Sequence, residues 1–221
     1  MQHGFADATA SVYCLRMERL TIRKASASDT DRIVELFAGD PGDEASGIAG
    51  SREKAIAFGT GMVRLPESPQ GWRQTVVAEM DGLVVGIIMA GGDHKDMRVT
   101  PQLVYLALRI FGPLGIISLL RRLRARVRVQ PKTPDGAYHV AEIDVDPASR
   151  NKGIGGALLE NAEAEARAGG YRLMSLTTST ANPARRLYER HGFRVVETRT
   201  DTAYKRYTEI DGRYLMVKDL R

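Results

Sequence analysis

The residues with the clearest chemical potential form a glycine-rich turn between an apolar strand and an apolar helix. The strand pattern ends at Val-Asp-Pro147, and the helix pattern begins around Gly153. Uncovered backbone N–H groups and the positive end of a helix dipole meet in such a turn, so it attracts a pyrophosphate. The residues expected to contact this ligand are Arg150, Asn151, Lys152, Gly153, Ile154, Gly155 and Gly156.

The order of residues in the turn excludes two common phosphate-binding motifs. A P-loop needs Gly-Lys-Ser/Thr after a four-residue spacer, and the turn does not contain it. The dinucleotide fingerprint needs Gly-x-Gly-x-x-Gly, whereas this turn reads Arg150-x-x-Gly153-x-Gly155. An alternative without a ligand is that the glycines only permit tight packing of the helix on the strand.

A second motif follows about one helix and one strand later. Residues 182–193 read Asn-Pro-Ala-Arg-Arg-Leu-Tyr-Glu-Arg-His-Gly-Phe. Together, the two motifs resemble the acetyl-CoA signature and the late helix of the GNAT superfamily of N-acyltransferases. The resemblance is detailed over residues 138–195, whereas residues 17–91 match only in the order of strands and helices.

The resemblance implies an α+β fold with a mixed, mostly antiparallel central sheet flanked by helices. The sheet is splayed between its fourth and fifth strands, and acyl-CoA lies in the opening. In this family the backbone of the fourth strand, opened by a bulge, binds the pantetheine amides and the acyl carbonyl. This implies cofactor contacts by Ile143 and Val145, and Asn182 joins the expected cofactor-binding residues.

The implied reaction is direct transfer of an acyl group, most often acetyl from acetyl-CoA, to an amine within a ternary complex. The amine, with a pKa near ~10.4, must lose a proton, and the departing thiolate is helped by gaining one. Tyr188 matches the tyrosine of the family by position and is the predicted general acid. The alternative role for Tyr188 is that of a packed core aromatic.

Other chemistries fit less well. A covalent route is not expected, because Cys14 is the only cysteine and no Gly-x-Ser-x-Gly elbow is present. No metal is expected. A non-catalytic protein of the same fold that senses acyl-CoA or a partner is the alternative function.

The predicted base lies on the strand over residues 138–146. Strict alternation places His139, Ile143 and Val145 on one face, and Val140, Glu142 and Asp144 on the other. Glu142 is the first choice for the base and Asp144 the second, although each also suits a solvated strand position. The two histidines considered as further candidates are His139 and His191.

Alternation, helical periodicity and turn residues predict the elements that position these side chains. Asp81-Gly82 indicates a two-residue hairpin turn between strands over 75–80 and 83–89. Residues 39–50 are rich in glycine and acids and are expected to form a loop. The other expected strands are 20–23, 138–146, 173–178, 193–198 and 214–218, and the other expected helices are 31–37, 52–58, 155–168 and 183–190.

Residues 92–138 are expected to be a helical insertion before the fourth strand. A helix begins at Thr100-Pro101, and Gly112-Pro113 breaks it. Residues 102–120 approach the length of a membrane span, but the break and Arg109 within them argue against one. We expect a two-helix flap over the acceptor site or a contact in a homodimer, with contact of residues 102–128 with a membrane surface as the alternative.

Composition favours one globular domain. The chain has 221 residues, of which 27% are charged and 43% hydrophobic. Its single cysteine excludes an internal disulfide framework and a Cys-rich metal site. Residues 1–16 show no periodicity, so they are expected to be a disordered extension before a natural start at Met17. The acyltransferase domain is expected over 17–221, in the cytoplasm because no secretory signal pattern is seen.

The net charge of +5 comes from one segment. Residues 97–134 contain eight basic residues and no acid, and subtracting these eight from +5 leaves −3 for the rest of the chain. A nucleic-acid-binding protein more often spreads its basic residues along a face with aromatics between them, and no aromatic lies between Arg121 and Arg128. The expected partner is therefore an amine-bearing small molecule or protein, and no nucleic acid.

Overall fold

The computed structural model describes residues 20–38, 42–65, 68, 71–92 and 99–221. The described strands form one sheet in the order β1-β2-β3-β4-β5-β7-β6, in which only the β4–β5 pair is parallel. The strands are β1 (Leu20–Lys24), β2 (Thr75–Met80), β3 (Leu83–Gly91), β4 (Tyr138–Val145), β5 (Leu173–Ser179), β6 (Arg194–Thr200) and β7 (Gly212–Asp219). The predicted mixed, mostly antiparallel sheet is confirmed. The expected extension over 1–16 and the start at Met17 lie outside the described residues.

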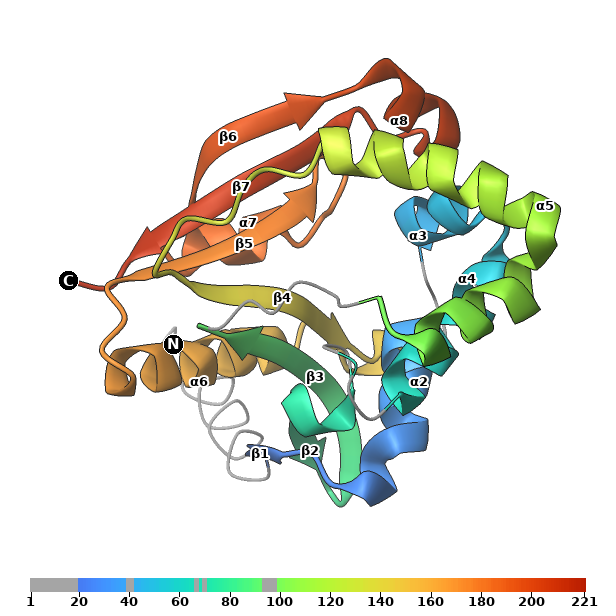
Figure 1. The fold of residues 1–221 in the computed structure, drawn as a ribbon. Helices are drawn as coiled ribbons and strands as arrows, with labels where there is room; N and C mark the ends of the chain where they lie inside the picture. Colours follow the sequence, from blue (N-terminus) through green and yellow to red (C-terminus); the bar gives the residue numbers. More distant parts are fainter. Residues whose placement is uncertain (1–19, 39–41, 66–67, 69–70, 93–98) are drawn as a thin grey trace, which may run out of the picture.

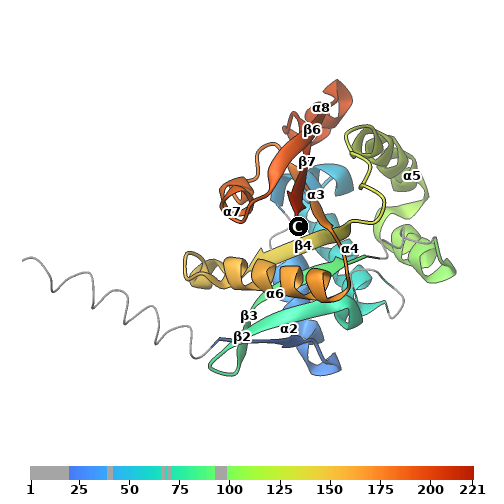
Figure 2. The ribbon, with the colours of Figure 1, turned by 90° about the vertical axis from the view of Figure 1, so that its left-hand side faces the viewer.

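Helices pack on both faces of the sheet (Figure 1, Figure 2). They are α2 (Thr30–Ala38), α3 (Gly42–Ala49), α4 (Arg52–Arg64), α5 (Pro101–Arg128), α6 (Ile154–Ala168), α7 (Arg185–Arg190) and α8 (Thr202–Thr208), with short 3-10 turns η1 (Ala27–Asp29), η2 (Trp72–Gln74) and η3 (Pro147–Ser149). The largest core joins α6 and α7 to one face through residues such as Leu158 and Tyr188. A second core joins α2 and α4 to the other face through Ile33 and Val63. Helices α5 and α8 meet around Tyr204, with α3 packed against them.

The predicted hairpin is confirmed. β2 and β3 pair in antiparallel register, and Asp81 and Gly82 connect them with φ angles of 53° and 79°. Positive φ at both turn residues matches the right-handed twist of the flanking strands, and an Asp-Gly pair adopts it readily. These two residues thereby fix the register of the strand that pairs with β4.

The pairing between β4 and β5 is short. It runs from Tyr138 opposite Met174 to Val140 opposite Leu176. Residues 142–145 of β4 pair with β3 but not with β5, so the second edge of their backbone is open within the described sheet. The predicted splay between the fourth and fifth strands lies at this place.

Ala141 is an extra residue in β4. On the neighbouring strand β3, Met89 lies opposite Glu142 and Ala90 lies opposite Val140, so Ala141 has no counterpart. This two-against-one pairing is a β-bulge, which bends a strand and changes which side chains face each side. The bulge predicted for this strand is confirmed at Ala141.

The bulge overturns the predicted alternation along β4. Val140 and Ile143 both pack against the core shared with α6, although they are three residues apart. Glu142 and Asp144 lie opposite residues of β3 that belong to the core of α2 and α4, so both carboxylates face that side. The grouping of Val140 with Glu142, and of His139 with Ile143, is therefore wrong, because strict alternation assumes that no residue is inserted.

The expected loop over 39–50 is also wrong over residues 42–49, because they form α3. Glycine disfavours helix on its own, so tertiary packing must hold this helix. Gly47 shows how: a Cβ atom at this position would lie 2.3 Å from the carbonyl oxygen of Tyr207 in α8. Only glycine lets α3 approach α8 this closely. Helix α8 itself was not predicted.

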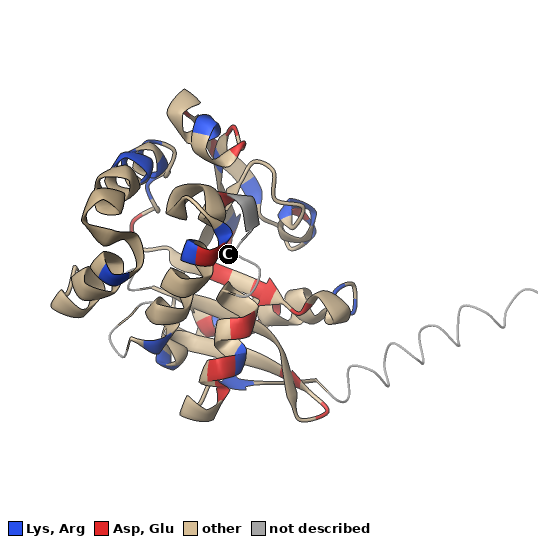
Figure 3. Cartoon of the chain, turned by 90° about the vertical axis from the view of Figure 1, so that its right-hand side faces the viewer, with Lys and Arg blue, Asp and Glu red and all other residues tan. Residues whose placement is uncertain are grey.

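The predicted helical insertion is confirmed as α5. It bends at Gly112, where φ is +67°, directly before Pro113. The helix contacts α3, α4 and α8 and carries a series of arginines without acids (Figure 1, Figure 3). Among the described residues, α5 alone is long and apolar enough to cross a membrane by length and composition, and 11% of its most apolar window is buried.

The contact at Gly47 leads to a stability prediction. A Gly47→Ala variant should lose about 1–3 kcal/mol through overpacking against the Tyr207 carbonyl. This loss exceeds the gain in helix propensity of about 1 kcal/mol. The melting temperature should therefore fall by a few degrees, which calorimetry would measure.

Gly91→Ala is the matched control, because nothing lies within 4 Å of a Cβ atom built at Gly91. This variant should melt within about 0.5 kcal/mol of the wild type. Equal melting of the two variants would show that α3 does not depend on its close approach to α8.

Candidate active site

Two features define the path of the glycine-rich turn after β4: the contacts of Asp146 and a reversal of the chain at Asn151 and Gly153. The carboxylate of Asp146 accepts a hydrogen bond from the N–H of Ala148 at 2.8 Å and pairs with Arg32 of α2. The chain then reverses at Asn151 and Gly153, whose φ angles are 60° and 84°. Glycine adopts such a conformation without strain, which accounts for Gly153 directly before α6.

Five consecutive backbone amides are available at this turn. The N–H groups of residues 152–156 have no hydrogen-bond partner within the described part of the chain, whereas the N–H of Ala157 bonds the carbonyl of Gly153 at 3.0 Å. These free donors point out of the first turn of a 15-residue helix, where the helix dipole adds positive potential. The turn fits a diphosphate group.

The two cationic side chains of the turn fold back on the loop. Arg150 Nε donates to the carbonyl of Val145 at 3.2 Å, and Lys152 Nζ donates to the carbonyl of Ala148 at 2.7 Å. Both charges therefore lie beside the free amides and increase the attraction for an anion.

The alternative role of the glycines, tight packing, is also present. A Cβ atom at Gly155 would lie 3.0 Å from Cδ2 of Leu187, and one at Gly156 would lie 3.1 Å from Nε2 of His191. Both neighbours belong to the second motif. The glycines thus bring α7 against the start of α6 and, at the same place, leave the amides uncovered.

The carboxyls of Glu142 and Asp144 lie side by side on β4 and interact by a hydrogen bond. Burial, and then the charge of Asp144, raise the pKa of Glu142 well above its usual range, although Arg213 partly opposes this. Burial also raises the pKa of Asp144, which Arg150 partly opposes. Such a like-charge pair favours one ionised carboxylate and one carboxyl that titrates near neutral pH.

Tyr188 approaches the same place from α7. It is 5% exposed, and its ring packs edge-on against Phe193 at 6.4 Å between centroids, so it belongs to the core. Burial, followed by the charges of Glu142 and Asp144, raises the pKa of its phenol. The hydroxyl makes no hydrogen bond with any described residue. The three predicted catalytic residues therefore lie near enough for the charges of Glu142 and Asp144 to act on the Tyr188 phenol.

A buried cluster beside the carboxyl pair was missed by sequence reasoning. Arg213 of β7 contacts Glu44 of α3 at 2.6 Å and the carbonyl of Thr177 at 3.0 Å, while its buried Nε atom has no hydrogen-bond partner among the described residues. Arg126 of α5 contacts the same glutamate at 2.7 Å. The only signal in the sequence that could have indicated this cluster was Arg213, an arginine within the mostly apolar last strand.

Three other predicted residues have defined neighbours. His139 is 3% exposed, and its Nδ1 lies 2.9 Å from Oγ of Ser175, so it sits in the core and not at the opening. His191 lies against the start of α6 and away from the proposed base position. Asn182 accepts from the N–H of Ala184 and donates to Thr178, each at 2.8 Å, which fixes the entry to α7. A contact of Asn182 with the cofactor stays a prediction.

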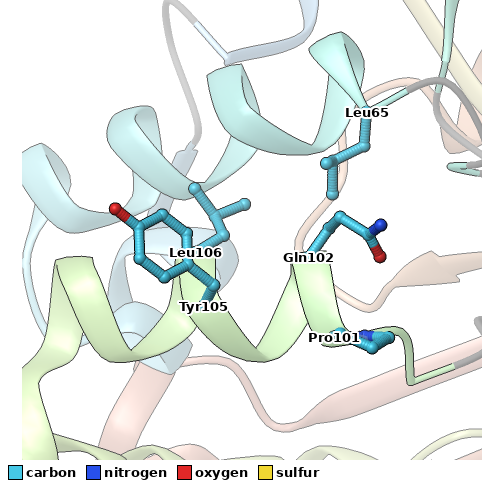
Figure 4. A pocket seen from close by; sticks show the side chains of 5 residues that line it. All are labelled: Leu65, Pro101, Gln102, Tyr105 and Leu106. Atoms are coloured by element: carbon cyan, nitrogen blue, oxygen red, sulfur yellow. The ribbon is translucent and has the colours of Figure 1, made fainter.

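Outside this site, the structure has an open apolar hollow of about 450 Å³ (Figure 4). It lies between the end of α4 and the start of α5 and is lined by Leu65, Pro101, Gln102, Tyr105 and Leu106. None of the predicted site residues contributes to it. Within the described residues, no group of three or more His, Cys, Asp or Glu side chains is arranged to hold a metal ion.

The raised pKa values of the carboxyl pair predict a pH dependence of stability. Because the folded state holds these protons more tightly than the unfolded chain, the free energy of unfolding should fall as the pH rises from about 4 through the raised pKa values. A Glu142→Gln variant should lose the part of this dependence that Glu142 contributes, a slope of at most about 1.4 kcal/mol per pH unit. Urea unfolding at a series of pH values would measure the slope.

Glu160→Gln is the matched control, since Glu160 is exposed on α6. It should follow the wild-type profile. A Glu142→Gln profile that also follows the wild type would show that Glu142 ionises as freely in the folded protein as in the unfolded chain.

Comparisons with known proteins agree with this geometry. The family model described as an acetyltransferase (GNAT) domain matches residues 71–195, which is more than half of the chain. No curated protein matches. Among solved structures, one acetyltransferase is 24% identical, with coverage of 91% of this chain and 100% of that one and a TM-score of 0.57.

Two further solved structures share the fold. An N-acetyltransferase from Staphylococcus aureus Mu50 is 16% identical, with coverage of 89% and 99% and a TM-score of 0.57. The PaiA N-acetyltransferase from Thermoplasma acidophilum, in complex with coenzyme A, is 16% identical, with coverage of 90% and 98% and a TM-score of 0.54. The family model spans both motifs and the splayed part of the sheet. The chain therefore belongs to the GNAT family of acetyltransferases, enzymes that transfer an acyl group from acyl-CoA.

Proposed function

We propose that this enzyme transfers the acetyl group of acetyl-CoA directly to a primary amine, with Glu142 as the base and Tyr188 as the acid. The observation that carries the proposal is that the charges of Glu142 and Asp144, beside the open edge of β4, act on the buried phenol of Tyr188. The acid approaches from the side of α6 and α7, and the base from the opposite side. A thioester in the opening would lie between them.

The proposed site for acetyl-CoA has two parts. The free amides of residues 152–156, with Arg150 and Lys152 beside them, hold the diphosphate. The open edge of β4, at Ile143 and Val145, offers backbone groups to the pantetheine amides and the acyl carbonyl. A hydrogen bond to that carbonyl stabilises the negative charge that develops on its oxygen.

Glu142 is the proposed base because its pKa is raised toward the working pH. An ammonium substrate loses one proton before attack, and the nitrogen loses a second as the amide forms. The carboxyl pair accepts these protons in turn; one leaves to solvent, and the other restores the phenol of Tyr188 after it has protonated the thiolate. Asp144 is the second choice, since it shares the same proton through its hydrogen bond with Glu142.

Tyr188 is the proposed acid, and its acidity depends on the state of the base. Burial, and then the charges of Glu142 and Asp144, raise the pKa of the phenol and keep it protonated before the reaction. When the carboxyl pair takes up a proton from the amine, this repulsion weakens and the pKa of Tyr188 falls. The phenol then protonates the thiolate as the C–S bond breaks. Deprotonation of the amine is thereby coupled to protonation of the leaving group.

Direct transfer needs both substrates at once. The only cysteine, Cys14, lies outside the described residues, and no serine elbow is present in the sequence. The identity of the amine and the cytoplasmic location stay predictions. The alternative function, a sensor that binds acyl-CoA without turnover, predicts thiol release at the background rate with every amine.

The first test concerns the anion-binding turn. A Gly155→Val variant should abolish measurable binding of CoA in calorimetry, because the side chain covers the free amides and pushes on Leu187. Ala164→Val is the matched control, an equally β-branched residue at an exposed position later in α6. Wild-type affinity for CoA in Gly155→Val would refute the proposed diphosphate site.

The second test concerns Tyr188. A Tyr188→Phe variant should lower kcat by about 10²- to 10⁴-fold with little change in KM for acetyl-CoA, because the hydroxyl acts only as the thiolate forms. The ring and its contact with Phe193 remain, so the melting temperature serves as the internal control. Near-full kcat with a good amine would show that Tyr188 is only a core aromatic.

A further inference from the structure

Helix α5 presents an apolar outer face that no described element covers. In its N-terminal part, Tyr105 is 66% exposed, and beyond the bend Leu114 is 83% exposed. The exposed apolar residues of this outer face are Val104, Tyr105, Leu108, Leu114, Ile117, Leu120, Leu123 and Val127. Single exposed apolar residues are common on protein surfaces, but a continuous face of this kind marks an interaction site.

The opposite side of α5 fixes the helix firmly to the domain. Ala125 is fully buried against α8, and Arg126 pairs with Glu44 of α3. Arg122 donates to the carbonyl of Gly47 at 2.6 Å and stacks on Tyr207 at 5.1 Å. The outer face is therefore held in a defined orientation relative to the enzyme.

The charges on the outer face are of one sign. Arg109, Arg121 and Arg124 are exposed and form no ion pair with any residue in the described ranges. The arginines along α5 have no acidic residue among them (Figure 3). An apolar face with unpaired arginines complements a surface that is both apolar and anionic.

We propose that α5 docks the enzyme on the surface of an anionic lipid bilayer. Its apolar residues would enter the boundary between headgroups and acyl chains, while Arg109, Arg121 and Arg124 contact lipid phosphates. The proposal is independent of the catalytic assignment, because it concerns a surface that contains no proposed catalytic residue.

Tyr105 belongs both to the outer face and to the apolar hollow at the start of α5 (Figure 4). Tyrosine favours the membrane interface, where its ring is apolar and its hydroxyl remains hydrated. The hollow beside it adds apolar surface at the end of the helix that carries fewer arginines.

The geometry argues against a span. The bend at Gly112 divides α5 into pieces of about 11 and 16 residues, which reach about 17 and 24 Å at 1.5 Å per residue. Each piece is shorter than the hydrocarbon core of about 30 Å. The inner side of the helix is also held to α3, α4 and α8, so the helix would lie on the bilayer.

Two other occupants fit the same face less well. In a two-fold contact between copies of this chain, the same patch meets itself, so unpaired arginines would meet arginines without an acid between them. Nucleic acid would leave Leu114, Leu120 and Val127 without apolar partners. A bilayer satisfies both the apolar residues and the charges.

The test uses flotation of the full chain with vesicles of phosphatidylcholine, with or without phosphatidylglycerol. We expect binding to the anionic vesicles that weakens with added salt, and much weaker binding to the neutral ones. Leu120→Glu should lower the affinity for vesicles at least about tenfold, because a leucine side chain that enters the bilayer is lost. Arg121→Gln with Arg124→Gln should lower it about thirtyfold on anionic vesicles.

The matched controls are Leu83→Glu, at a leucine 69% exposed in the β2–β3 hairpin, and Arg172→Gln with Arg194→Gln, at exposed arginines away from α5. Both should bind vesicles like the wild type. Absence of vesicle binding, or equal losses in the controls, would overturn the proposal. A dimer in ultracentrifugation that Leu120→Glu dissociates, with no vesicle binding, would also overturn it. The same holds if the bound protein resists alkaline extraction, as a membrane-spanning protein does.

Discussion

The separation of β4 from β5 after Val140 is the constraint on which the rest of the site depends. It leaves the backbone edge of residues 142–145 without a strand partner, so these groups are free to bind water or a ligand. The bulge at Ala141 turns Glu142 and Asp144 away from the α6 core at the start of the open edge. The charges of both carboxyls act on the buried phenol of Tyr188 on the other side of β4. Closing the sheet would satisfy the backbone and remove the site.

The sequence predicted the features whose cause lies within a few residues. The hairpin follows from Asp81-Gly82, because those two residues alone supply the positive φ angles that the turn requires. The anion-binding turn follows from Gly153, which reverses the chain, and from the small residues after it. Local conformational rules are enough for both. Tyr188, in contrast, was placed by the resemblance of the second motif to the GNAT family and not by a local rule.

The parts that could not be predicted depend on contacts between distant segments. Glu44 and Arg213 are 169 positions apart, and no local pattern links them. Helix α3, which carries Glu44, has a glycine-rich sequence typical of a loop and is helical because Gly47 fits against α8. The bulge at Ala141 changes no residue type, so alternation alone gave the wrong face for Val140. The helical insertion was predicted, but its anchoring by Arg126 to the buried cluster was not.

The balance of charge around the opening gives the proposed acceptor a physical basis. Arg126 and Arg213 both contact Glu44, so their charges are largely engaged before Glu142 and Asp144 are considered. Burial raises the pKa values of both carboxyls, and the charge of Asp144 raises that of Glu142 further. A cationic amine entering the opening would relieve this repulsion and gain an ion pair. The amide product is neutral and would lose that attraction. The same carboxyl pair would thus favour binding of the substrate, deprotonation of its nitrogen and release of its product.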